Sequence, residues 1–517
     1  MIYSNQRPPA YEGRGDAYLA PTLKNLRRVL GGTQRDFAYA TLRLGSDSLD
    51  EVAGILVDFA EDLHNGTGIW EAFERYNTEF FGDALPFVAT DNGGGDVRAV
   101  FHPNRFRHFL WILYPVFIER LVLSPSHQDL QRIAQASSDF LADAFSAIPK
   151  DSGVKAFLRT PNERGWDVKK KLIWLGCHSF MFRAFFARAM ENTGGKSAIG
   201  QIDDFVCQEC TPWSGLGVID ILATVLDISQ DDRSDLRSWY ERHAAFYKLL
   251  SVSNETLEAV NVINDQPYRI RIDMQSHPFK RGQFIFGSLT PWRGEWYWSG
   301  EQRFMGDASQ VDIADLIQTM KRTNSPIVCR YSKDYEAQTR ERASKLHGKM
   351  LAFYGKDLVI YPDGMSMAAD WQKELRSDWE SRPKQEVKKV IEKHGLVKGR
   401  PEMNIPRDLL EQKDGLGVFL NPEEGKEVMT HFTSLIAGLK KKGNGLTKDE
   451  EDVIRGFFNA DSVSPRFVRR VLEEIGDESV KAAFMLKGDL PRYWLDYLLR
   501  ARKGIFYRKR YPSVSVI

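Results

Sequence analysis

Four side chains in the first half of the chain are of the types that bind zinc. Cys207 and Cys210 form a close cysteine pair, and Cys177 and His178 stand side by side some 30 residues upstream. A tetrahedral zinc site needs four such ligands to converge. However, no second Cys-x-x-Cys is present, and Cys177 lies in the apolar run Leu172–Phe186, where a small buried thiol is common. We therefore predict no cofactor and keep zinc, bound by Cys207, Cys210, Cys177 and His178, as the alternative.

A predicted helix near residue 60 also combines a carboxylate with an imidazole. Glu61 and His64 are three residues apart and so share one helical face. Di-iron bundles use two such pairs and two further glutamates, whereas this sequence contains one pair. We interpret the pair as a helix end, with His64 near the C-terminal dipole and before the turn Asn65-Gly66.

Two short segments are similar to parts of nuclease signatures. His347-Gly-Lys349 matches half of the phospholipase D-type signature, in which the histidine attacks phosphorus, but no second copy follows. Glu424-Gly-Lys426 is similar to the acid-x-Lys pair of restriction-type nucleases, which should lie on a strand. Here we expect a helix that starts at Asn421-Pro422 instead. Neither segment therefore predicts a nuclease site.

The best-marked catalytic motifs are missing from the sequence. It contains no G-x-G-x-x-G, no G-x-x-x-x-G-K-[ST], no G-x-S-x-G and no H-E-x-x-H. An enzyme with an unmarked site would need acid–base groups, for which histidine is suited near neutral pH. His178, His243 and His347 are the candidates, and a phosphodiesterase- or nuclease-type hydrolase is the alternative function.

The C-terminus concentrates positive charge and aromatic rings. The segment Arg492–Ile517 has seven basic residues and one acidic residue, Asp496. Such a patch attracts phosphate backbones through counterion release, and aromatic side chains add base stacking. We predict that nucleic acid or another polyanion binds Arg500, Arg502, Lys503, Phe506, Tyr507, Arg508, Lys509, Arg510 and Tyr511. The alternative is structural, with the basic side chains at a helix C-terminus and the tail folded back on the protein.

A second group of aromatic residues lies in a predicted strand. Trp292, Trp296 and Trp298 fall within seven residues, and alternation sends Trp296 and Trp298 to one face and Tyr297 to the other. Exposed aromatics on a small barrel often stack bases or grip peptides. The four residues are therefore aromatic surface candidates. Because half of a strand must face inward, the interpretation that Trp296 and Trp298 are core is favoured.

Apolar spacing predicts the elements that position these residues. The first 250 residues have the three- and four-residue spacing of helices. The predicted helices are Ser46–His64, Gly68–Phe81, Asn104–Leu123, Ser126–Ile148, Val168–Asn192, Leu216–Ile228 and Ser234–Leu250. Between Thr256 and Met305 the period shortens to two, which predicts four or five short strands.

The remaining chain returns to helical spacing. A helix is predicted at Ser332–Tyr354 and a strand at Leu358–Tyr361, followed by a charged helix and a proline-containing linker. In the last hundred residues, Thr447-x-x-Glu450 is a capping box, and Ser464-Pro465 is a cap with proline at the first helical position.

These patterns define the predicted fold class and domains. The fold class is α+β and predominantly α-helical, with a helical N-terminal half, a small antiparallel β-barrel or curled sheet near 256–305, and a C-terminal bundle of short helices. The predicted domains are a helical domain (1–250), a small β-module with flanking helices (251–372), a charged helix and linker (373–414), and a C-terminal helical bundle with a basic tail (415–517).

Composition limits the function classes. The chain has 71 Lys and Arg against 70 Asp and Glu, so no global field draws it to nucleic acid or membrane. No apolar run reaches the ~20 residues that a bilayer requires, and no membrane partner is expected. Four cysteines in 517 residues do not make a disulfide framework, which predicts a cytoplasmic location. We expect a multidomain binding or adaptor protein whose partner is a protein or a nucleic acid.

Overall fold

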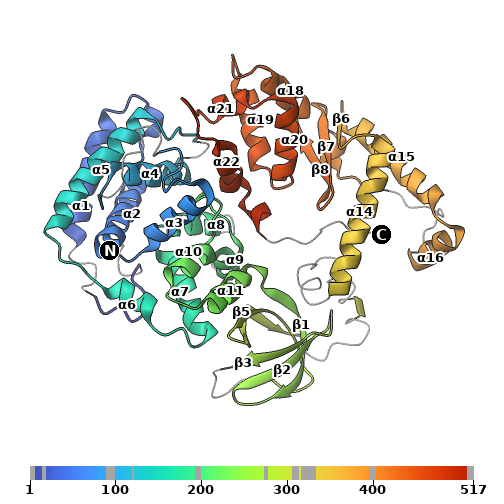
Figure 1. The fold of residues 1–517 in the computed structure, drawn as a ribbon, viewed down its shortest axis with the longest axis horizontal. Coiled ribbons are helices and arrows are strands. Elements are labelled where there is room, and N and C mark those ends of the chain that lie inside the picture. Colours follow the sequence, from blue (N-terminus) through green and yellow to red (C-terminus); the bar gives the residue numbers. More distant parts are fainter. Residues whose placement is uncertain are drawn as a thin grey trace. The chain divides into compact units, whose positions relative to one another are not determined.

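The computed structural model describes residues 6–13, 19–88, 99–118, 121–191, 199–272, 278–305, 314–315, 319, 333–394 and 403–508. The chain divides into two compact units. Unit 1 comprises residues 1–327 and 485–507, and unit 2 comprises residues 328–484 and 508–517. Each unit is described by itself below, with the labels of Figure 1.

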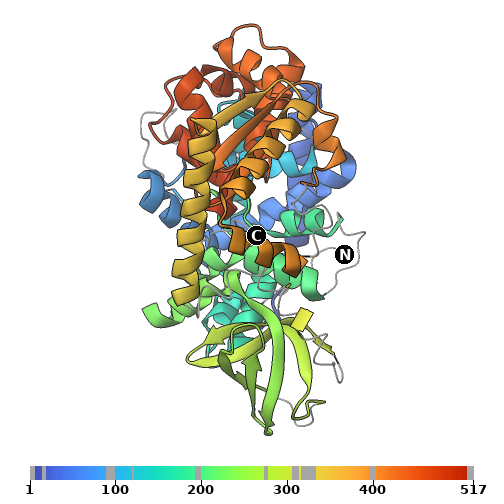
Figure 2. The same cartoon turned by 90° about the vertical axis from the view of Figure 1, so that its right-hand side faces the viewer.

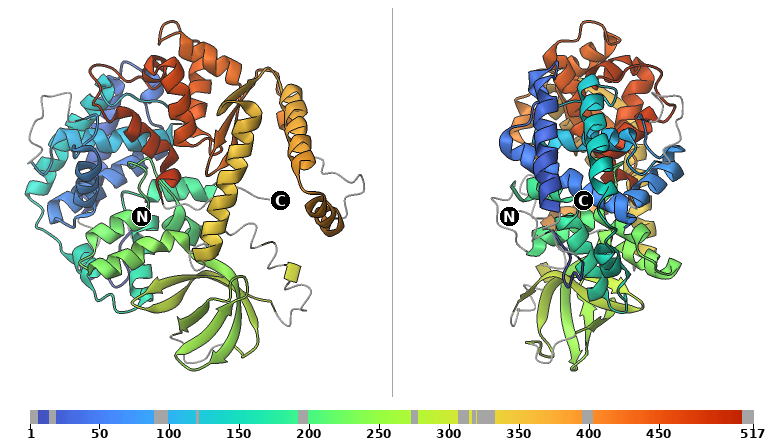
Figure 3. Two further views of the ribbon diagram at one scale, coloured as in Figure 1. Left: turned by 45° about the vertical axis from the view of Figure 1, so that its right-hand side comes forward. Right: turned by 90° about the vertical axis from the view of Figure 1, so that its left-hand side faces the viewer.

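The N-terminal part of unit 1 is a helical bundle with one continuous apolar core. Helix α1 lies beside α5, as Figures 1 and 3 show. Its helices are α1 (Ala20–Arg35), α2 (Ser46–Asn65), α3 (Ile69–Phe81), α4 (Pro103–Phe117), α5 (Gln128–Ser146), α6 (Gly153–Arg159), α7 (Gly165–His178), α8 (Arg183–Glu191), α9 (Ile199–Gln208), α10 (Val218–Val225) and α11 (Gln230–Ser238), with 3-10 turns η2 (Ala40–Leu42) and η4 (Trp239–Glu241). The predicted helical half is confirmed.

Three predicted helices differ from the structure. The helix predicted as Asn104–Leu123 is α4, which ends at Phe117. The stretch predicted as Val168–Asn192 is two helices, α7 and α8, separated by an extended Ser179. The prediction of a helix over Ser234–Leu250 is wrong, because α11 ends at Ser238 and strand β1 (His243–Val252) follows the 3-10 turn. In β1 every second residue from His243 to Leu249 is buried, so the period there is two.

The β-module of unit 1 is a closed five-stranded barrel, visible at the bottom of Figure 2. Its strands are β1, β2 (Thr256–Asn261), β3 (Pro267–Arg271), β4 (Phe284–Trp292) and β5 (Glu295–Phe304). The order around the ring is β1-β2-β3-β5-β4, and β1 pairs with β4 to close it. All pairs are antiparallel except β3 with β5, which is parallel. The predicted barrel is thus confirmed. It contains one strand, β1, before the predicted segment, and one of its strand pairs is parallel.

Unit 2 combines short helices with a small sheet. Its elements are α14 (Lys333–Tyr354), β6 (Leu358–Tyr361), α15 (Gly364–Ser381), α16 (Lys384–His394), α17 (Arg407–Leu410), β7 (Leu416–Asn421), β8 (Gly425–Thr430), α18 (Phe432–Lys440), α19 (Lys448–Asn459), α20 (Pro465–Ile475) and α21 (Glu478–Ala483). The antiparallel sheet has the order β6-β7-β8. Both predicted caps are present, since Thr447 Oγ1 accepts from Glu450 N and Ser464 Oγ accepts from Phe467 N.

The helix predicted to start at Asn421-Pro422 does not exist. Asn421 ends β7 and Pro422 begins the turn to β8, where the Asn421 side-chain oxygen accepts hydrogen bonds from the backbone N–H of Glu423 and Glu424. An asparagine that bonds the following backbone caps a helix or makes a tight turn equally well. Lys426 consequently lies on a strand, β8.

The last described helix, α22 (Trp494–Lys503), and the 3-10 turn η5 (Gly504–Tyr507) belong to unit 1. Tyr497 is buried and stacks on Trp111 of α4, with ring centroids 5.9 Å apart. Its ring also meets Phe81 of α3 edge-on. The fold as a whole is mostly helical α+β, as predicted. Within the described ranges, no helix is both long and apolar enough to cross a membrane.

Candidate functional site

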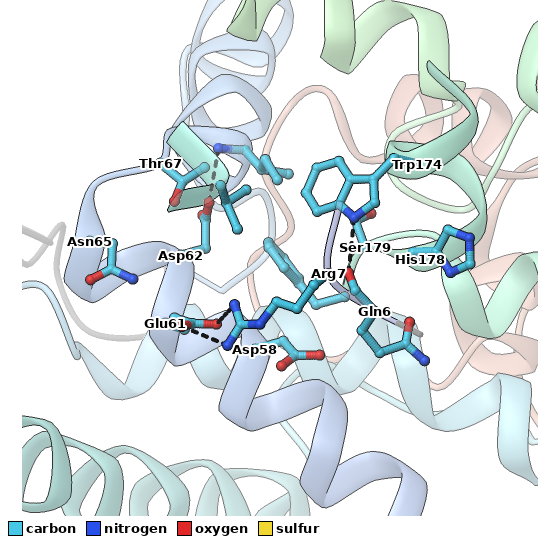
Figure 4. A pocket seen from close by; sticks show the side chains of 13 residues that line it. Gln6, Arg7, Asp58, Glu61, Asp62, Asn65, Thr67, Trp174, His178 and Ser179 are labelled. Carbon is cyan, nitrogen blue, oxygen red and sulfur yellow. Dashed lines mark hydrogen bonds and ion pairs between the residues drawn. The ribbon is translucent and has the colours of Figure 1, made fainter. Parts of the chain in front are cut away.

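A small polar pocket lies in unit 1 where the N-terminal segment 6–13 crosses helices α2 and α7 (Figure 4). Helix α2 contributes Asp58, Glu61 and Asp62, which share one face because they are three and four residues apart. The opposite wall carries Trp174 and His178 from the end of α7. The pocket therefore brings three carboxyl groups and one imidazole together.

Arg7 enters this pocket and pairs with Glu61. The two guanidinium Nη atoms donate to the two carboxylate oxygens at 2.8 and 3.1 Å, a bidentate pair that Figure 4 marks. Only 11% of the Arg7 side chain and 8% of the Glu61 side chain is exposed. The guanidinium also lies 4.8 Å from the ring centroid of Tyr11, and the indole N–H of Trp174 donates to the Gln6 carbonyl. These contacts hold the N-terminal segment on the helices.

Asp62 caps the following helix from inside the pocket. Its two carboxylate oxygens accept the backbone N–H groups of Ile69 and Trp70 at 3.2 and 3.0 Å, at the start of α3. Burial raises the pKa of Asp62 to about 7, although both hydrogen bonds favour the charged form. The group thus exchanges a proton near neutral pH.

The other polar groups of the pocket are also engaged inside the protein. Asp58 pairs with Arg183 of α8, and the Ser179 hydroxyl donates to the Leu175 carbonyl. Burial and the nearby Arg183 lower the pKa of His178, so its imidazole is neutral at pH 7. The hollow itself measures about 40 Å³, room for a few water molecules. These groups do not form a pair of nucleophile and base. The pocket instead anchors residues 6–13.

A second ionic cluster fixes the barrel to the helices. Asp203 of α9 is 2% exposed and pairs with both Lys169 of α7 and Arg242. The Ser299 hydroxyl of β5 bonds the same carboxylate at 2.9 Å. Burial opposes the charged form of Asp203, but the two cations outweigh it and hold its pKa below the usual value. Next to this cluster, a Cβ on Gly165 would lie 2.7 Å from the Tyr297 ring, so glycine lets β5 approach α7.

The barrel presents aromatic and basic side chains on the outside of β1, β4 and β5. We call this surface the β1–β4 face: Phe246, Lys248, Phe284, Phe286 and Arg303. The three phenylalanines are half-buried, and both cations are exposed. The rings of Phe246 and Phe286 lie 4.8 Å apart, and Lys248 Nζ is 5.9 Å from the Phe284 centroid. Arg303 pairs with Glu301 at 3.2 Å.

Comparison with known proteins finds a family model that matches part of the chain. This model, described as "Protein of unknown function (DUF3843)", matches residues 50–196. This stretch contains most of α2, the helices α3 to α8 and most of the pocket, including Asp58, Glu61, Asp62 and His178, whereas the barrel lies outside it. No curated protein and no solved structure matches the chain.

The four residues considered for zinc are not brought together as ligands. In the described part of the chain, no group of three or more His, Cys, Asp or Glu side chains is arranged to hold a metal ion. Cys207 is buried beside the ionic cluster, 3.3 Å from Lys169 Nζ, and Cys210 is half-buried. Cys177 is half-buried on α7, where burial raises the pKa of its thiol. His178 lies in the polar pocket.

The basic C-terminal segment is partly built into unit 1. Arg500 lies between the rings of Phe80 and Tyr507, at 4.3 and 4.6 Å from their centroids, and Lys503 is buried. Arg502 and Tyr507 are exposed, while Phe506 and Arg508 are half-buried. The remaining predicted residues, Lys509, Arg510 and Tyr511, lie outside the described residues.

The tryptophan cluster faces inward. Trp292, Tyr297 and Trp298 are each less than 5% exposed, and the Trp292 indole donates to the Asn162 carbonyl. Trp296 is half-buried, with its ring centroid 4.5 Å from that of His243. The aromatic surface expected here is therefore limited to part of Trp296, and the core interpretation holds for Trp298.

The remaining histidine candidates make structural contacts. His243 is 2% exposed and shares a hydrogen bond with the Tyr268 hydroxyl at 3.0 Å. His347 bonds the Leu420 carbonyl, and His64 bonds the Ile148 carbonyl at 2.8 Å. His64 therefore does not share a site with Glu61.

Sequence reasoning missed the residues that the structure groups most closely. Arg7, Asp203 and Arg242 carry no motif, and their partners are distant in sequence. Phe246 and Lys248 are not singled out in the sequence analysis, because the spacing there predicts a helix over Ser234–Leu250 where the structure has β1. The signal was available, since residues 243 to 250 alternate between buried and outward positions once the segment is considered as a strand.

Proposed function

We propose that this protein binds single-stranded nucleic acid through the β1–β4 face of its barrel. The observation that carries the proposal is the pairing of half-exposed phenylalanine rings with exposed cations on one sheet surface. Every base offers a π-face to such rings, and cations beside them attract the phosphate backbone. The same surface supplies no row of polar groups for reading base edges, so binding would be sequence-tolerant.

The strand order supports this proposal at the level of fold. A five-stranded barrel with the ring order β1-β2-β3-β5-β4 resembles OB-fold barrels, many of which bind oligonucleotides or oligosaccharides. Those barrels bind mainly over strands 2 and 3, whereas the aromatic rings here lie on β1 and β4. The likeness is an analogy of architecture, and the exposed side chains carry the argument.

The basic C-terminus has a secondary place in the proposal. Of its described cations, Arg502 is exposed, whereas Lys503 is buried and Arg500 is held between two rings. The segment would add electrostatic attraction rather than a stacking surface. An adaptor role with a protein partner is compatible with the same barrel face. We also propose a cytoplasmic location, because Cys177 and Cys207 are free thiols.

The hydrolase alternative is supported less well by the geometry. His178 does lie near Asp58, Glu61 and Asp62, but these carboxylates are engaged by Arg183, Arg7 and the start of α3. A general base must reach the proton that it abstracts, and groups held in internal pairs are poorly placed to do so. Binding is therefore the function that we favour.

Fluorescence anisotropy of labelled single-stranded DNA and RNA, with the full chain titrated at several salt concentrations, tests the proposal. We expect saturable binding that weakens as salt rises. Phe286→Ala should weaken it by about 1–3 kcal/mol if the ring stacks on a base. Lys248→Gln should weaken it for all sequences and reduce the salt slope by about one.

Phe353→Ala, which removes an exposed phenylalanine of α14, is the matched control and should leave binding unchanged. Melting temperatures of all variants establish that they fold. Absence of binding at low salt, or equal losses in Phe286→Ala and Phe353→Ala, would overturn the proposal.

A further inference from the structure

A hollow of about 390 Å³ opens beside helix α1. The helix buries Leu26, Leu30 and Gln34 on one side. The described lining of the hollow consists of basic and small residues with one leucine: Lys24, Arg27, Arg28, Arg35, Gly31, Gly32 and Leu49. Positions 24, 28, 31, 32 and 35 follow helical spacing and therefore form one stripe. The stripe carries basic side chains at both ends and only glycines in the middle.

The positive charge of this hollow is only partly neutralised. Arg27 pairs with Asp50, and its guanidinium also donates to the Ser46 hydroxyl at 2.9 Å. Arg28 donates to the Asn25 side-chain oxygen at 3.0 Å, which leaves its charge in place. Among the residues that the structure describes, no carboxylate pairs with Lys24, Arg28 or Arg35, and all three are exposed. Three cations thus face one hollow.

The two glycines are not explained by the fold. Neither has a positive φ, so the backbone does not require glycine there. A Cβ on Gly32 would meet nothing within 4 Å, and a Cβ on Gly31 would make an ordinary 3.5 Å contact with Leu49. Glycine inside a helix is less favourable than alanine, because it loses more backbone freedom on folding. What the pair does provide is a floor without side chains between Arg28 and Arg35.

We propose that this hollow binds a small anion with two or more phosphoryl groups, seated over Gly31 and Gly32 between Arg28 and Arg35. Guanidinium groups bond phosphate oxygens in pairs, and glycine allows an anion to approach the backbone closely. The volume is that of a small-ligand site. The described lining has no aromatic ring on which a base would stack, so the site is independent of the nucleic-acid face proposed above.

Isothermal titration calorimetry of the full chain with inorganic tripolyphosphate tests this inference, with sulfate as the single-anion comparison. We expect one saturable site for tripolyphosphate and much weaker binding of sulfate. Arg28→Gln and Arg35→Gln should each weaken tripolyphosphate binding by roughly tenfold or more. Arg159→Gln, which removes an exposed arginine of α6, is the matched control and should have no effect.

Gly32→Leu gives a signature that a merely unfolded variant cannot produce. Leucine favours helix and has open space at this position, so the melting temperature should rise while tripolyphosphate binding is lost. Phe286→Ala should leave tripolyphosphate binding unchanged, which separates this site from the barrel face. Absence of saturable binding to the unmodified chain, unchanged binding in Gly32→Leu, or an equal loss in Arg159→Gln would overturn the inference.

Discussion

Two groups of charged residues in unit 1 differ in what surrounds them. At the ionic cluster, Asp203 is 2% exposed and is bonded by Lys169, Arg242 and Ser299. At the hollow beside helix α1, which we call the α1 hollow, the exposed cations Arg28 and Arg35 have no carboxylate partner among the described residues. A buried charge without partners is costly, whereas an exposed one is not. The first group is therefore committed to holding the barrel on the helices, and the second is free to meet a ligand.

The polar pocket resembles the first group. The side chains of Arg7 and Glu61 are about nine-tenths buried and pair with each other. Their interaction therefore contributes to folding stability rather than to ligand binding. This difference predicts that substitutions should separate cleanly into those that change stability and those that change ligand affinity.

The largest effect is expected for Asp203→Ala. It leaves Lys169 and Arg242 buried without their shared carboxylate, which should lower the free energy of unfolding by about 3–5 kcal/mol. Urea unfolding followed by circular dichroism measures this. Asp204→Ala, next in sequence and 64% exposed, removes a surface partner of Arg242 and should cost under about 1 kcal/mol. Equal costs for the two variants would contradict the assignment of the cluster as the structural link.

A smaller loss is expected for Arg7→Ala. The change leaves Glu61 buried and without the guanidinium that bonds both its oxygens, and should cost about 1.5–3 kcal/mol. It should also release residues 6–13, so proteolysis near the N-terminus should become faster. Arg7→Lys keeps the charge but not the bidentate geometry, and is expected to recover part of the loss. If Arg7→Ala unfolds at the same urea concentration as the unmodified chain, the anchor is not formed in solution.

The pH dependence of stability should reveal Asp62. Its pKa is about 7 in the folded protein, above its ordinary value of 3.8, because it is buried. Between these values the folded state binds more protons than the unfolded state, so stability falls as pH rises and levels off above about pH 7. Asp62→Asn should remove this contribution, on the order of 1 kcal/mol between pH 6 and pH 7.

Histidines with lowered pKa, such as His64 and His178, act in the opposite direction. The test is therefore the difference between the unmodified chain and Asp62→Asn, measured by urea unfolding at pH 5, 6 and 7.5. Parallel pH profiles for the two proteins would exclude a raised pKa at Asp62.

The elements that sequence predicts well are those fixed by neighbours in the chain. The caps at Thr447 and Ser464 depend on side chains three residues apart, and both are present. The sequence predicts a helix in place of strand β1, because the alternation from His243 to Leu249 follows directly on a helix and contains aliphatic residues that suit either period. Likewise, an asparagine followed by proline at position 421 is compatible with both a cap and a turn.

The candidate sites were harder to predict because their members meet through tertiary structure. Asp203 draws its partners from α7, from residue 242 and from β5, at separations of 34 to 96 residues. Residue type was also misleading: Trp292 and Trp298 are core, whereas ordinary phenylalanines at 246 and 286 face outward. Only strand register distinguishes the two sets, and register depends on the closed barrel.

The smallest effect on stability is expected at the α1 hollow, and it completes the comparison. Arg35→Gln removes an exposed cation with no described carboxylate partner, so the free energy of unfolding should change by less than about 0.5 kcal/mol. The substitution also lowers the like-charge repulsion with Arg28 and Lys24, so the small change in the free energy of unfolding can have either sign. Urea unfolding at low salt, where surface charges are least screened, gives the most sensitive measurement. A loss above about 1 kcal/mol would show that Arg35 has a structural partner, and the contrast between the two charge groups would fail.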